Sequence, residues 1–401
     1  MVLLVHPGTQ YSYQLAKQLA RHQKLAEFWT GFALAENAWY TRAIQTFLPN
    51  SWNRKIANRI IRDVPISRLR TKPLIGLKAV NQIRRGHSPQ VVFHKINGEF
   101  QRKIPSSVIE DASAVIGFDT SSWLIAERAK NLNKPFFLDQ SISHPVANES
   151  VLRAVVQRFP KWREDFESRL PVVLYAENQE HALATKIVAA SSYTKRTLIS
   201  EGVKEDKIIV NPYGVSVQKF QPADEKSIHR PLRFIFVGSV SARKGVPLLL
   251  EAWRSLDLTN CELWLVGPLT PHVRSLIPEL PGLKVLGKYP HKELPNLFRQ
   301  ADVFVFPSYC EGFGLVLLEA LASGLPIVTT EATAGPDLIQ DGVEGFIVPS
   351  GNQDELCRAM KYFVDNPGKL PEMSVAARRC AEKFTWDAYG DRWNRLLEEY
   401  I

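Results

Sequence analysis

A glycine followed by two adjacent cations predicts an anion site in the second half of the sequence. Gly238 directly follows the apolar run Phe234–Val237, which is typical of a strand, and Arg243 and Lys244 stand where a helix should begin. A helix N-terminus attracts anions through its free N–H groups and positive dipole end. The pattern favours phosphate or diphosphate binding, with a solvated helix start as the alternative. It is not a P-loop, which needs a glycine where Arg243 stands.

Two carboxylates form a second constellation after the apolar run Val303–Phe306. In the segment PSYCEGFGLVLLEA, Glu311 lies in the expected loop and Glu319 lies within the helix that Gly314 opens. Two carboxylates placed in this way can accept hydrogen bonds from separate hydroxyl groups of one polyol. Glu319 is surrounded in sequence by leucine and valine, where an unpaired carboxylate is costly. This favours a ligand role for Glu319 over that of an ordinary helix glutamate.

These residues carry a resemblance to a known family. The spacing of Glu311 and Glu319 within PSYCEGFGLVLLEALASGLPIVTT resembles the signature of the retaining glycosyltransferases of the GT-B fold, the large family 4. Three further segments support this resemblance: VGSVSARKG, Val210–Val215 and DLIQDGVEGFIVPSG. The resemblance covers roughly residues 185–401. It implies that the C-terminal domain binds a nucleotide-diphosphate-sugar donor.

The resemblance also implies a role for each matched residue. Lys244 would hold the diphosphate with Arg243 beside it, Glu319 would bind the ribose hydroxyls, and Glu311 would bind hydroxyls of the donor sugar. The remaining donor-site residues are Gly238, Gly312, Phe313, Gly314 and Leu315, with backbone amides of the Gly-Phe-Gly segment facing the sugar. Among the residues closest to the reaction we expect Lys244, Glu311 and His144.

The sequence departs from the family pattern at several positions. Ser239 stands where many members have an arginine, so Arg243 is expected to replace that charge, and Ser216 stands where an aspartate is common. The first loop, His6 to Gln10, keeps Gly8 as the sole glycine of a glycine-rich acceptor loop. We expect Gly8, together with Asp119, to lie on the acceptor side of the cleft.

In the N-terminal half, His144 is the best placed histidine. It lies just beyond the predicted strand in KPFFLDQ, in a loop where the family often places a histidine near the reacting carbon. We expect it to line the cleft, with a capping or structural role as the alternative. Asp119 follows the run Ala114–Phe118, and a helix N-cap is the favoured interpretation there. His6 and His94 end or interrupt apolar strands and could line the cleft; the others are expected mostly at the surface without partners, namely His22, His87, His181, His229, His272 and His291.

The alternation of strands and helices predicts the fold class. Apolar β-branched runs alternate with longer helical patterns, which is typical of parallel sheets covered by helices; the runs are Ala114–Phe118, Ile187–Ala190, Phe234–Val237, Leu263–Val266, Val303–Phe306 and Ile327–Thr329. Together with the resemblance this predicts an α/β protein of GT-B architecture, two Rossmann-like doubly wound parallel-sheet domains facing across a cleft. The expected parts are an acceptor-binding domain (1–220), a linker (221–231), a donor domain (232–385) and a final helix (386–401) that crosses back to the N-terminal domain.

Positive charge is concentrated in the N-terminal half. Residues 1–220 contain 31 Lys and Arg against 18 Asp and Glu, whereas residues 221–401 contain 19 against 23. The stretch 54–85 holds ten basic residues, and Trp52, Ile56 and Ile60 recur at helical spacing beside Arg54, Lys55, Arg59 and Arg62. A basic amphipathic helix there would contact a membrane surface or hold an acidic substrate, or it would simply be solvated. Nucleic-acid binding is not expected, because no recognised motif accompanies the charge.

The composition argues against metal-binding, redox and membrane-spanning proteins. The four cysteines, Cys261, Cys310, Cys357 and Cys380, form no metal or redox motif, and no apolar run approaches the ~18–20 residues of a membrane span. The N-terminus, MVLLVHPG, reads as a first strand rather than a signal peptide. We therefore expect a cytoplasmic protein, peripheral on the inner membrane face if the basic stretch binds lipid. No Asp-x-Asp motif occurs, so neither a metal nor a cofactor is expected.

The functional prediction is a retaining glycosyltransferase, an enzyme that transfers a hexose-like sugar to an acceptor hydroxyl. The acceptor is a glycan or a lipid-linked sugar, and the setting is synthesis of the cell envelope, an exopolysaccharide or a glycolipid. Two alternatives share the fold: a non-catalytic sugar-nucleotide-binding protein, and a sugar-nucleotide epimerase, which would turn over the donor alone. The sequence does not distinguish the base of the nucleotide, since its contacts in this fold are largely backbone and apolar.

Overall fold

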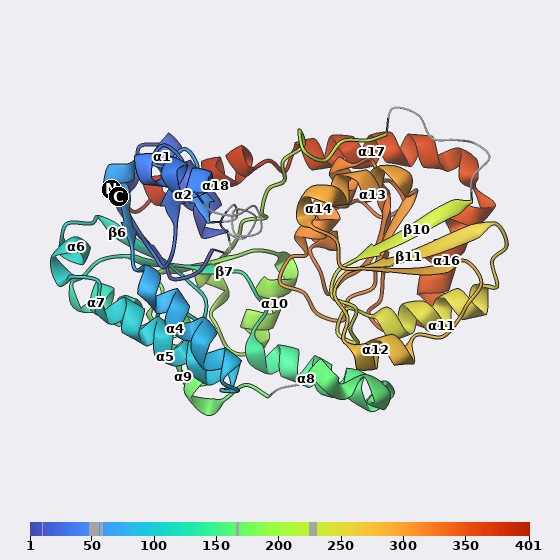
Figure 1. Cartoon of the computed structure of the whole chain (residues 1–401), viewed down its shortest axis with the longest axis horizontal. Helices are drawn as coiled ribbons and strands as arrows, with labels where there is room; N and C mark the ends of the chain where they lie inside the picture. The colour runs from blue at the N-terminus through green and yellow to red at the C-terminus, as the bar shows by residue number, and fades with distance from the viewer. Residues whose placement is uncertain (10, 48–55, 57–58, 166–167, 224–230) are drawn as a thin grey trace.

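Two α/β domains lie side by side in the computed structural model (Figure 1), which describes residues 1–9, 11–47, 56, 59–165, 168–223 and 231–401. Each domain is built on a parallel sheet with helices on its faces. The predicted fold class is confirmed: both sheets form from the alternating apolar runs, and each predicted run coincides with a strand to within two residues at either end.

Among the residues that the structure describes, the N-terminal sheet has seven parallel strands in the order β5-β2-β1-β6-β7-β8-β9. In chain order they are β1 (Val2–His6), β2 (Leu25–Thr30), β5 (Leu69–Thr71), β6 (Ala114–Phe118), β7 (Phe136–Gln140), β8 (Lys186–Ala189) and β9 (Ile208–Val210). The helices in the described part of this domain are α1 (Ser12–Arg21), α2 (Trp39–Phe47), α4 (Pro73–Arg84), α5 (Pro89–Arg102), α6 (Ser106–Glu110), α7 (Trp123–Asn131), α8 (Pro145–Arg158), α9 (Pro171–Leu183) and α10 (Ser192–Ser200). A six-residue 3-10 helix, η2 (Pro160–Asp165), extends α8.

The C-terminal sheet has six parallel strands in the order β12-β11-β10-β13-β14-β15. They are β10 (Leu232–Val237), β11 (Cys261–Val266), β12 (Leu283–Gly287), β13 (Val303–Phe306), β14 (Ile327–Thr330) and β15 (Gly345–Val348). The helices are α11 (Val246–Leu256), α12 (Pro271–Leu276), α13 (Leu294–Gln300), α14 (Leu315–Ala322), α15 (Gly335–Leu338), α16 (Gln353–Asp365), α17 (Leu370–Glu382) and α18 (Trp386–Glu398). A 3-10 turn, η4 (His291–Glu293), precedes α13.

The last helix, α18, lies against α1 of the N-terminal domain (Figure 1). Gln18 Nε2 donates to Asp387 Oδ1 at 2.9 Å, and the Tyr389 hydroxyl donates to buried Asp139 of β7 at 2.7 Å. Gly390 permits the approach, because a Cβ there would lie 2.5 Å from Gln18 Cβ. Two segments therefore pass between the domains: the one entering α18 and the one after β9, of which residues 224–230 of the expected linker lie outside the described residues.

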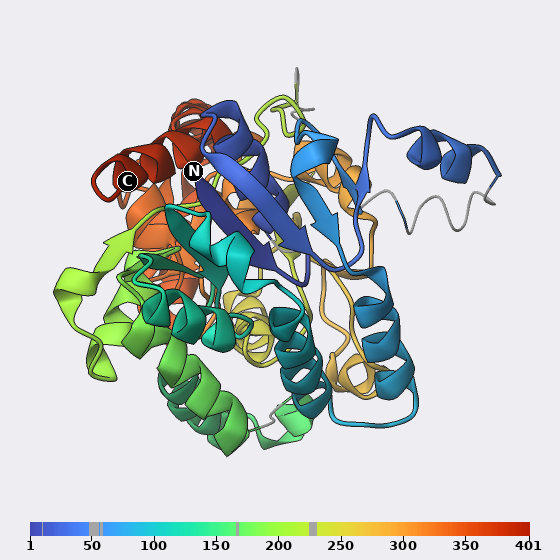
Figure 2. The ribbon, with the colours of Figure 1, turned by 90° about the vertical axis from the view of Figure 1, so that its left-hand side faces the viewer.

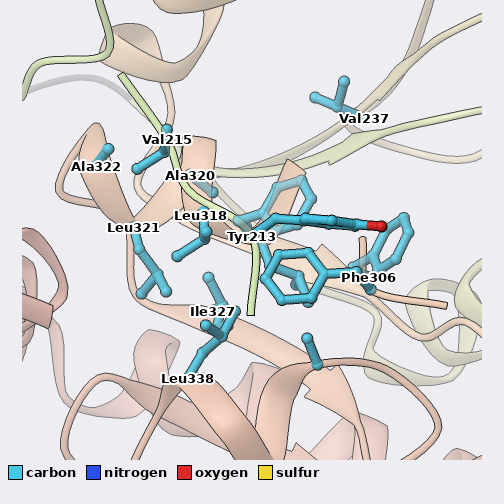
Figure 3. Close-up of a cluster of buried hydrophobic side chains, with 14 of the residues drawn as sticks. Tyr213, Val215, Val237, Phe306, Leu318, Ala320, Leu321, Ala322, Ile327 and Leu338 are labelled. Carbon is cyan, nitrogen blue, oxygen red and sulfur yellow. The ribbon is translucent and has the colours of Figure 1, made fainter. Parts of the chain in front are cut away.

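The hydrophobic core includes side chains of this second connection. Tyr213 and Val215 pack in the same cluster as Val237, Phe306 and Leu318 of the C-terminal domain (Figure 3). Tyr213 also lies 5.3 Å from the Phe313 ring, measured between ring centroids. Because these side chains are buried, the described part of the connection is packed into the hydrophobic core of the C-terminal domain.

The predicted basic helix near residue 56 is wrong at its C-terminal end. Ile60 lies in β4 (Ile60–Ile61), which pairs in parallel with β3 (Leu34–Ala35). Leu34 N–H donates to Arg59 O at 2.8 Å and Glu36 N–H to Ile61 O at 3.0 Å, so strand pairing replaces the helical pattern. Trp52, Arg54 and Lys55 lie outside the described residues. Figure 2 shows α2, which follows β3, projecting away from the N-terminal sheet.

Candidate functional site

The two cations predicted at a helix start lie in the loop that precedes it. Helix α11 begins at Val246, and Gly245, with φ of 74°, provides the left-handed turn before it. Its Cα approaches the loop after β13 so closely that a Cβ would lie 2.0 Å from Pro307 O. Lys244 and Arg243 are therefore held against the second motif, 63 or more residues later in the chain.

Lys244 and Arg243 meet Glu311 in one cluster. The Lys244 ammonium forms an ion pair with the Glu311 carboxylate and lies 4.8 Å from the centroid of the Phe306 ring. Arg243 Nη1 donates to Cys310 O at 2.9 Å and lies 3.4 Å from Glu311 Oε2. Burial, together with the neighbouring Arg243 charge, holds the pKa of Lys244 well below its usual range. Two basic side chains thus face one carboxylate.

Glu319 lies on α14, and its carboxylate has one hydrogen-bond partner among the described residues, a histidine that was expected at the surface without a partner. The Glu319 Oε1 atom is 2.6 Å from Nε2 of His291 on η4, so His291 is exposed as expected but does have a partner. Glu319 also lies close enough to the first loop for its charge to raise the pKa of Tyr11, whose burial is the larger cause of a pKa of about 12. Glu319 thus lies near Tyr11 of the N-terminal domain.

The N-terminal domain contacts the Glu311 loop directly. Gly312 lies so close to the loop after β7 that a Cβ there would lie 1.9 Å from Ser141 O. The Gly312 carbonyl accepts hydrogen bonds from Ser191 Oγ at 2.5 Å and from Thr194 Oγ1 at 2.9 Å. Ser191 and Thr194 were not singled out in the sequence, because serine and threonine at a helix start normally indicate a cap, and Ser191 is also the N-cap of α10.

His144 has the capping geometry that was its alternative role. It is the N-cap of α8: its Nδ1 accepts from Val146 N–H at 3.3 Å, and its own N–H donates to Thr197 Oγ1 at 3.0 Å. The side chain is buried, with its ring 5.3 Å from that of His181. Burial lowers the pKa of His144 and lowers that of His181 to about 3. His181 is therefore a buried residue and not the surface histidine we expected.

Asp119 is buried but does not cap a helix, so the favoured interpretation is wrong. Ser122 is the N-cap of α7, and the Asp119 carboxylate instead accepts from the Ser141 and Ile142 amides, both at 3.1 Å. The Ser141 hydroxyl donates to the same carboxylate at 3.0 Å. Burial raises the pKa of Asp119 to about 7. These hydrogen bonds to the Asp119 carboxylate fix the loop after β7, which contacts Gly312.

The remaining candidate residues of the N-terminal domain are His6, Gly8 and His94, and they lie in different surroundings. His6 ends β1, is buried, and has Nδ1 3.2 Å from Ser121 Oγ; burial lowers its pKa to about 3, so it is neutral. A Cβ on Gly8 would lie 3.0 Å from His6 Nε2, so the loop passes close to this ring. His94 was expected in a strand but lies on α5, stacked on Trp123 with ring centroids 4.7 Å apart.

Helix α8 and the loops of the C-terminal sheet border two open pockets. The first, of about 180 Å³, is bordered by Arg243, Ser239 and Ser241 on one side and by Val155 and Trp162 on the other. The second, of about 450 Å³, is bordered by Val155, Tyr193 and Tyr309. Among the described residues no group of three potential metal ligands gathers, and no helix combines the length and apolar character needed to cross a bilayer.

Parts of this chain are similar in sequence to known proteins. Residues 231–366 match the family described as Glycosyl transferases group 1, which identifies such a domain in the C-terminal half. The chain is 27% identical over 222 residues to the amylovoran biosynthesis glycosyltransferase AmsK of Erwinia amylovora, covering 52% of this chain and 53% of that protein. It is 28% identical over 276 residues to the MMP alpha-(1->4)-mannosyltransferase of Mycolicibacterium hassiacum, covering 66% of each. The chain thus spans about half to two thirds of the length of these relatives.

The similarity in fold to solved structures covers 99% of this chain. The structure of Anabaena HepE in complex with UDP and glucose superposes with a TM-score of 0.64 at 14% identity, covering 99% of both chains. Sucrose-phosphate synthase from Thermosynechococcus elongatus gives the same TM-score at 18% identity, covering 99% of this chain and 98% of the other. Because the sequence identity is low, these superpositions establish the fold alone, which is the GT-B fold.

Proposed function

We propose that this protein is a retaining glycosyltransferase that transfers a sugar from a nucleotide-diphosphate donor to an acceptor hydroxyl in polysaccharide or glycolipid synthesis. One observation carries the proposal: Arg243, Lys244 and Glu311 meet in one cluster at the end of the C-terminal sheet, and Glu319 lies on the helix that follows. The named glycosyltransferases among the relatives support the reaction class, and a relative of the same fold binds UDP.

The cluster supplies the charges that such a transfer needs. As the bond between sugar and diphosphate breaks, negative charge develops on the leaving diphosphate, and preorganised cations stabilise it. Lys244 and Arg243 would bind the diphosphate, Glu311 would exchange its ion pair for hydroxyl groups of the donor sugar, and Glu319 would accept from the ribose. In this proposal no metal is needed, because the two cations provide the positive charge.

The N-terminal domain would complete the site. Retention without a protein nucleophile requires the acceptor hydroxyl to attack from the face that the diphosphate leaves. His144 would act in positioning by starting α8, the helix that borders the pocket next to Arg243. Asp119 would act through the Ser141 loop, which lies on Gly312.

The donor site is tested by nucleotide-induced shifts in melting temperature. Ligand binding to the folded state raises the melting temperature by mass action. We expect one of UDP, GDP, ADP and CMP to stabilise the wild type and to lose this effect in Glu319→Ala. The control is Glu279→Ala, an exposed glutamate of the same domain. No shift with any nucleotide, or an undiminished shift in Glu319→Ala, would contradict the proposal.

A membrane-facing acceptor is part of the proposal. Within the basic stretch, α4 exposes Leu74 and Leu77 by 69% and 66%, and Lys78 and Arg84 lie on the same helix. Exposed leucines among cations are typical of surfaces that bind anionic lipid. We expect the protein to sediment with phosphatidylglycerol vesicles but not with phosphatidylcholine vesicles, and Leu74→Glu with Leu77→Glu to abolish this. Equal sedimentation of the double variant would remove α4 from the proposal.

A further inference from the structure

The Glu319 carboxylate is held by a chain of two hydrogen bonds that begins on the connection between the domains. Lys219 Nζ lies 2.8 Å from His291 Nδ1, and His291 Nε2 lies 2.6 Å from Glu319 Oε1. An ammonium only donates, so Nδ1 accepts a hydrogen bond from Lys219 and Nε2 carries the hydrogen that faces Glu319. The directions of both bonds follow from this one constraint.

The three members come from distant parts of the chain. Lys219 belongs to the connection that leaves the N-terminal domain after β9, His291 to η4 after β12, and Glu319 to α14. These segments are adjacent in space only because β12, β10 and β13 share one sheet. No short sequence motif therefore reports the arrangement.

A buried aromatic ring and an arginine hold the chain of bonds in place. Phe220, which is 2% exposed, packs edge-on against His291 at 5.7 Å between ring centroids, and Lys219 Nζ lies 5.3 Å from the Phe220 ring. Arg378 of α17 donates to the carbonyls of Val217, Phe220 and Ala322, at 3.0, 2.8 and 2.8 Å. The guanidinium thus ties the connection to the C-terminal end of α14, the helix that carries Glu319.

We propose that Lys219 and His291 are positioning residues of the donor site, which hold the Glu319 carboxylate in the orientation that accepts hydrogen bonds from the ribose hydroxyls. This inference rests on the proposed function. Among the described residues Glu319 Oε2 makes no hydrogen bond, so fixing Oε1 aims the remaining oxygen. A carboxylate oriented before the ligand arrives loses less side-chain entropy on binding, and second partners that fix a ligating group raise affinity in this way.

The inference predicts a loss of affinity that depends on the ribose. The probes are UDP and 2′,3′-dideoxyuridine diphosphate, measured by isothermal titration calorimetry with the full chain; if GDP or ADP gives the larger melting shift, that diphosphate and its dideoxy analogue replace them. His291→Ala is expected to weaken UDP binding about tenfold, which corresponds to about 1.4 kcal/mol, and Lys219→Met to weaken it about threefold. Both variants should bind the dideoxy nucleotide within twofold of the wild type.

Two further variants make the result decisive. His291→Gln keeps an N–H donor for Glu319 and should recover most of the affinity, and His87→Ala, an exposed histidine of the other domain, should change nothing. Equal losses for UDP and the dideoxy nucleotide, or no loss in His291→Ala, would overturn the inference. If His291→Ala is silent while Glu319→Ala still loses UDP, the inference alone fails. If Glu319→Ala also binds UDP like the wild type, the proposed function fails with it.

Discussion

Ionisable side chains serve different ends on the two sides of the interface. On the C-terminal side, Lys244 and Glu311 pair with each other, and a ligand with the matching charges can replace either partner. On the N-terminal side, Asp119 and Asp139 are fully enclosed and accept hydrogen bonds from amides and hydroxyls of their own surroundings. The first arrangement is suited to exchange partners with a substrate, and the second to hold a shape.

Removal of the Lys244 charge is expected to have the largest effect on the donor site. In Lys244→Met the apolar stem is retained while the diphosphate loses a cation. We expect sugar-nucleotide turnover to fall about 10²–10³-fold, the usual effect of removing one group that stabilises developing charge. The melting temperature should fall only modestly, because Arg243 Nη1 still lies 3.4 Å from Glu311 Oε2 and compensates the carboxylate that loses its Lys244 partner.

Turnover is measured as release of the nucleoside diphosphate, with Lys292→Met, an exposed lysine of η4, as the control. If Lys244→Met unfolded the protein while Lys292→Met did not, Lys244 would belong with the N-terminal carboxylates as a structural group. A fully active Lys244→Met would remove it from the donor site.

The second prediction concerns stability on the N-terminal side. Asp139 Oδ1 accepts from the Tyr213 hydroxyl at 3.1 Å and Oδ2 from Tyr389, so it joins the connection and α18 to β7. Burial raises the pKa of Asp139 to about 7, from about 3.8 in the unfolded chain. Between these two pH values the folded state binds a proton that the unfolded state has lost. Stability contributed by Asp139 is thus present near pH 4 and is lost as the pH rises to about 7.

We expect Asp139→Asn, which resembles the protonated acid, to gain stability relative to the wild type across this window. The slope should approach about 1.4 kcal/mol per pH unit and flatten above pH 7. Urea unfolding at pH 4, 5.5, 7 and 8 measures it. Asp119, whose pKa is also raised to about 7, titrates in the same range, so the difference between the two proteins is the quantity that counts. A difference independent of pH would show that Asp139 is ionised throughout.

The C-terminal side was the more predictable from the sequence. Gly238, Arg243 and Lys244 lie in one short segment and Glu311 to Glu319 in another, and both segments follow a strand of one parallel sheet. Since the carboxyl ends of parallel strands meet at one edge, local patterns were enough to place these residues together. The resemblance to a known family then supplied their roles.

The N-terminal side depends on contacts between residues far apart in sequence. Asp119 is satisfied by amides 22 and 23 residues later, and Tyr389 reaches Asp139 across 250 residues. The same reason hides His291, whose partners are 72 and 28 residues away. The hydrophobic period near Ile60 was misleading because pairing between β3 and β4 overrides local helical spacing.

The smallest predicted effect separates the two roles considered for His144. Asparagine is among the best N-cap residues, so His144→Asn should keep the start of α8, whereas His144→Ala should lose about 1 kcal/mol of unfolding free energy. If His144 acts only through α8, His144→Asn keeps kcat within about twofold of the wild type and His144→Ala lowers it in proportion to the loss of helix order. A kcat that falls equally in both variants, with stability kept in His144→Asn, would mean that the imidazole itself contacts the reacting sugar. His144 would then be a residue of the N-terminal side that exchanges its partner for the substrate. The contrast between the two sides of the interface would then hold only for the carboxylates.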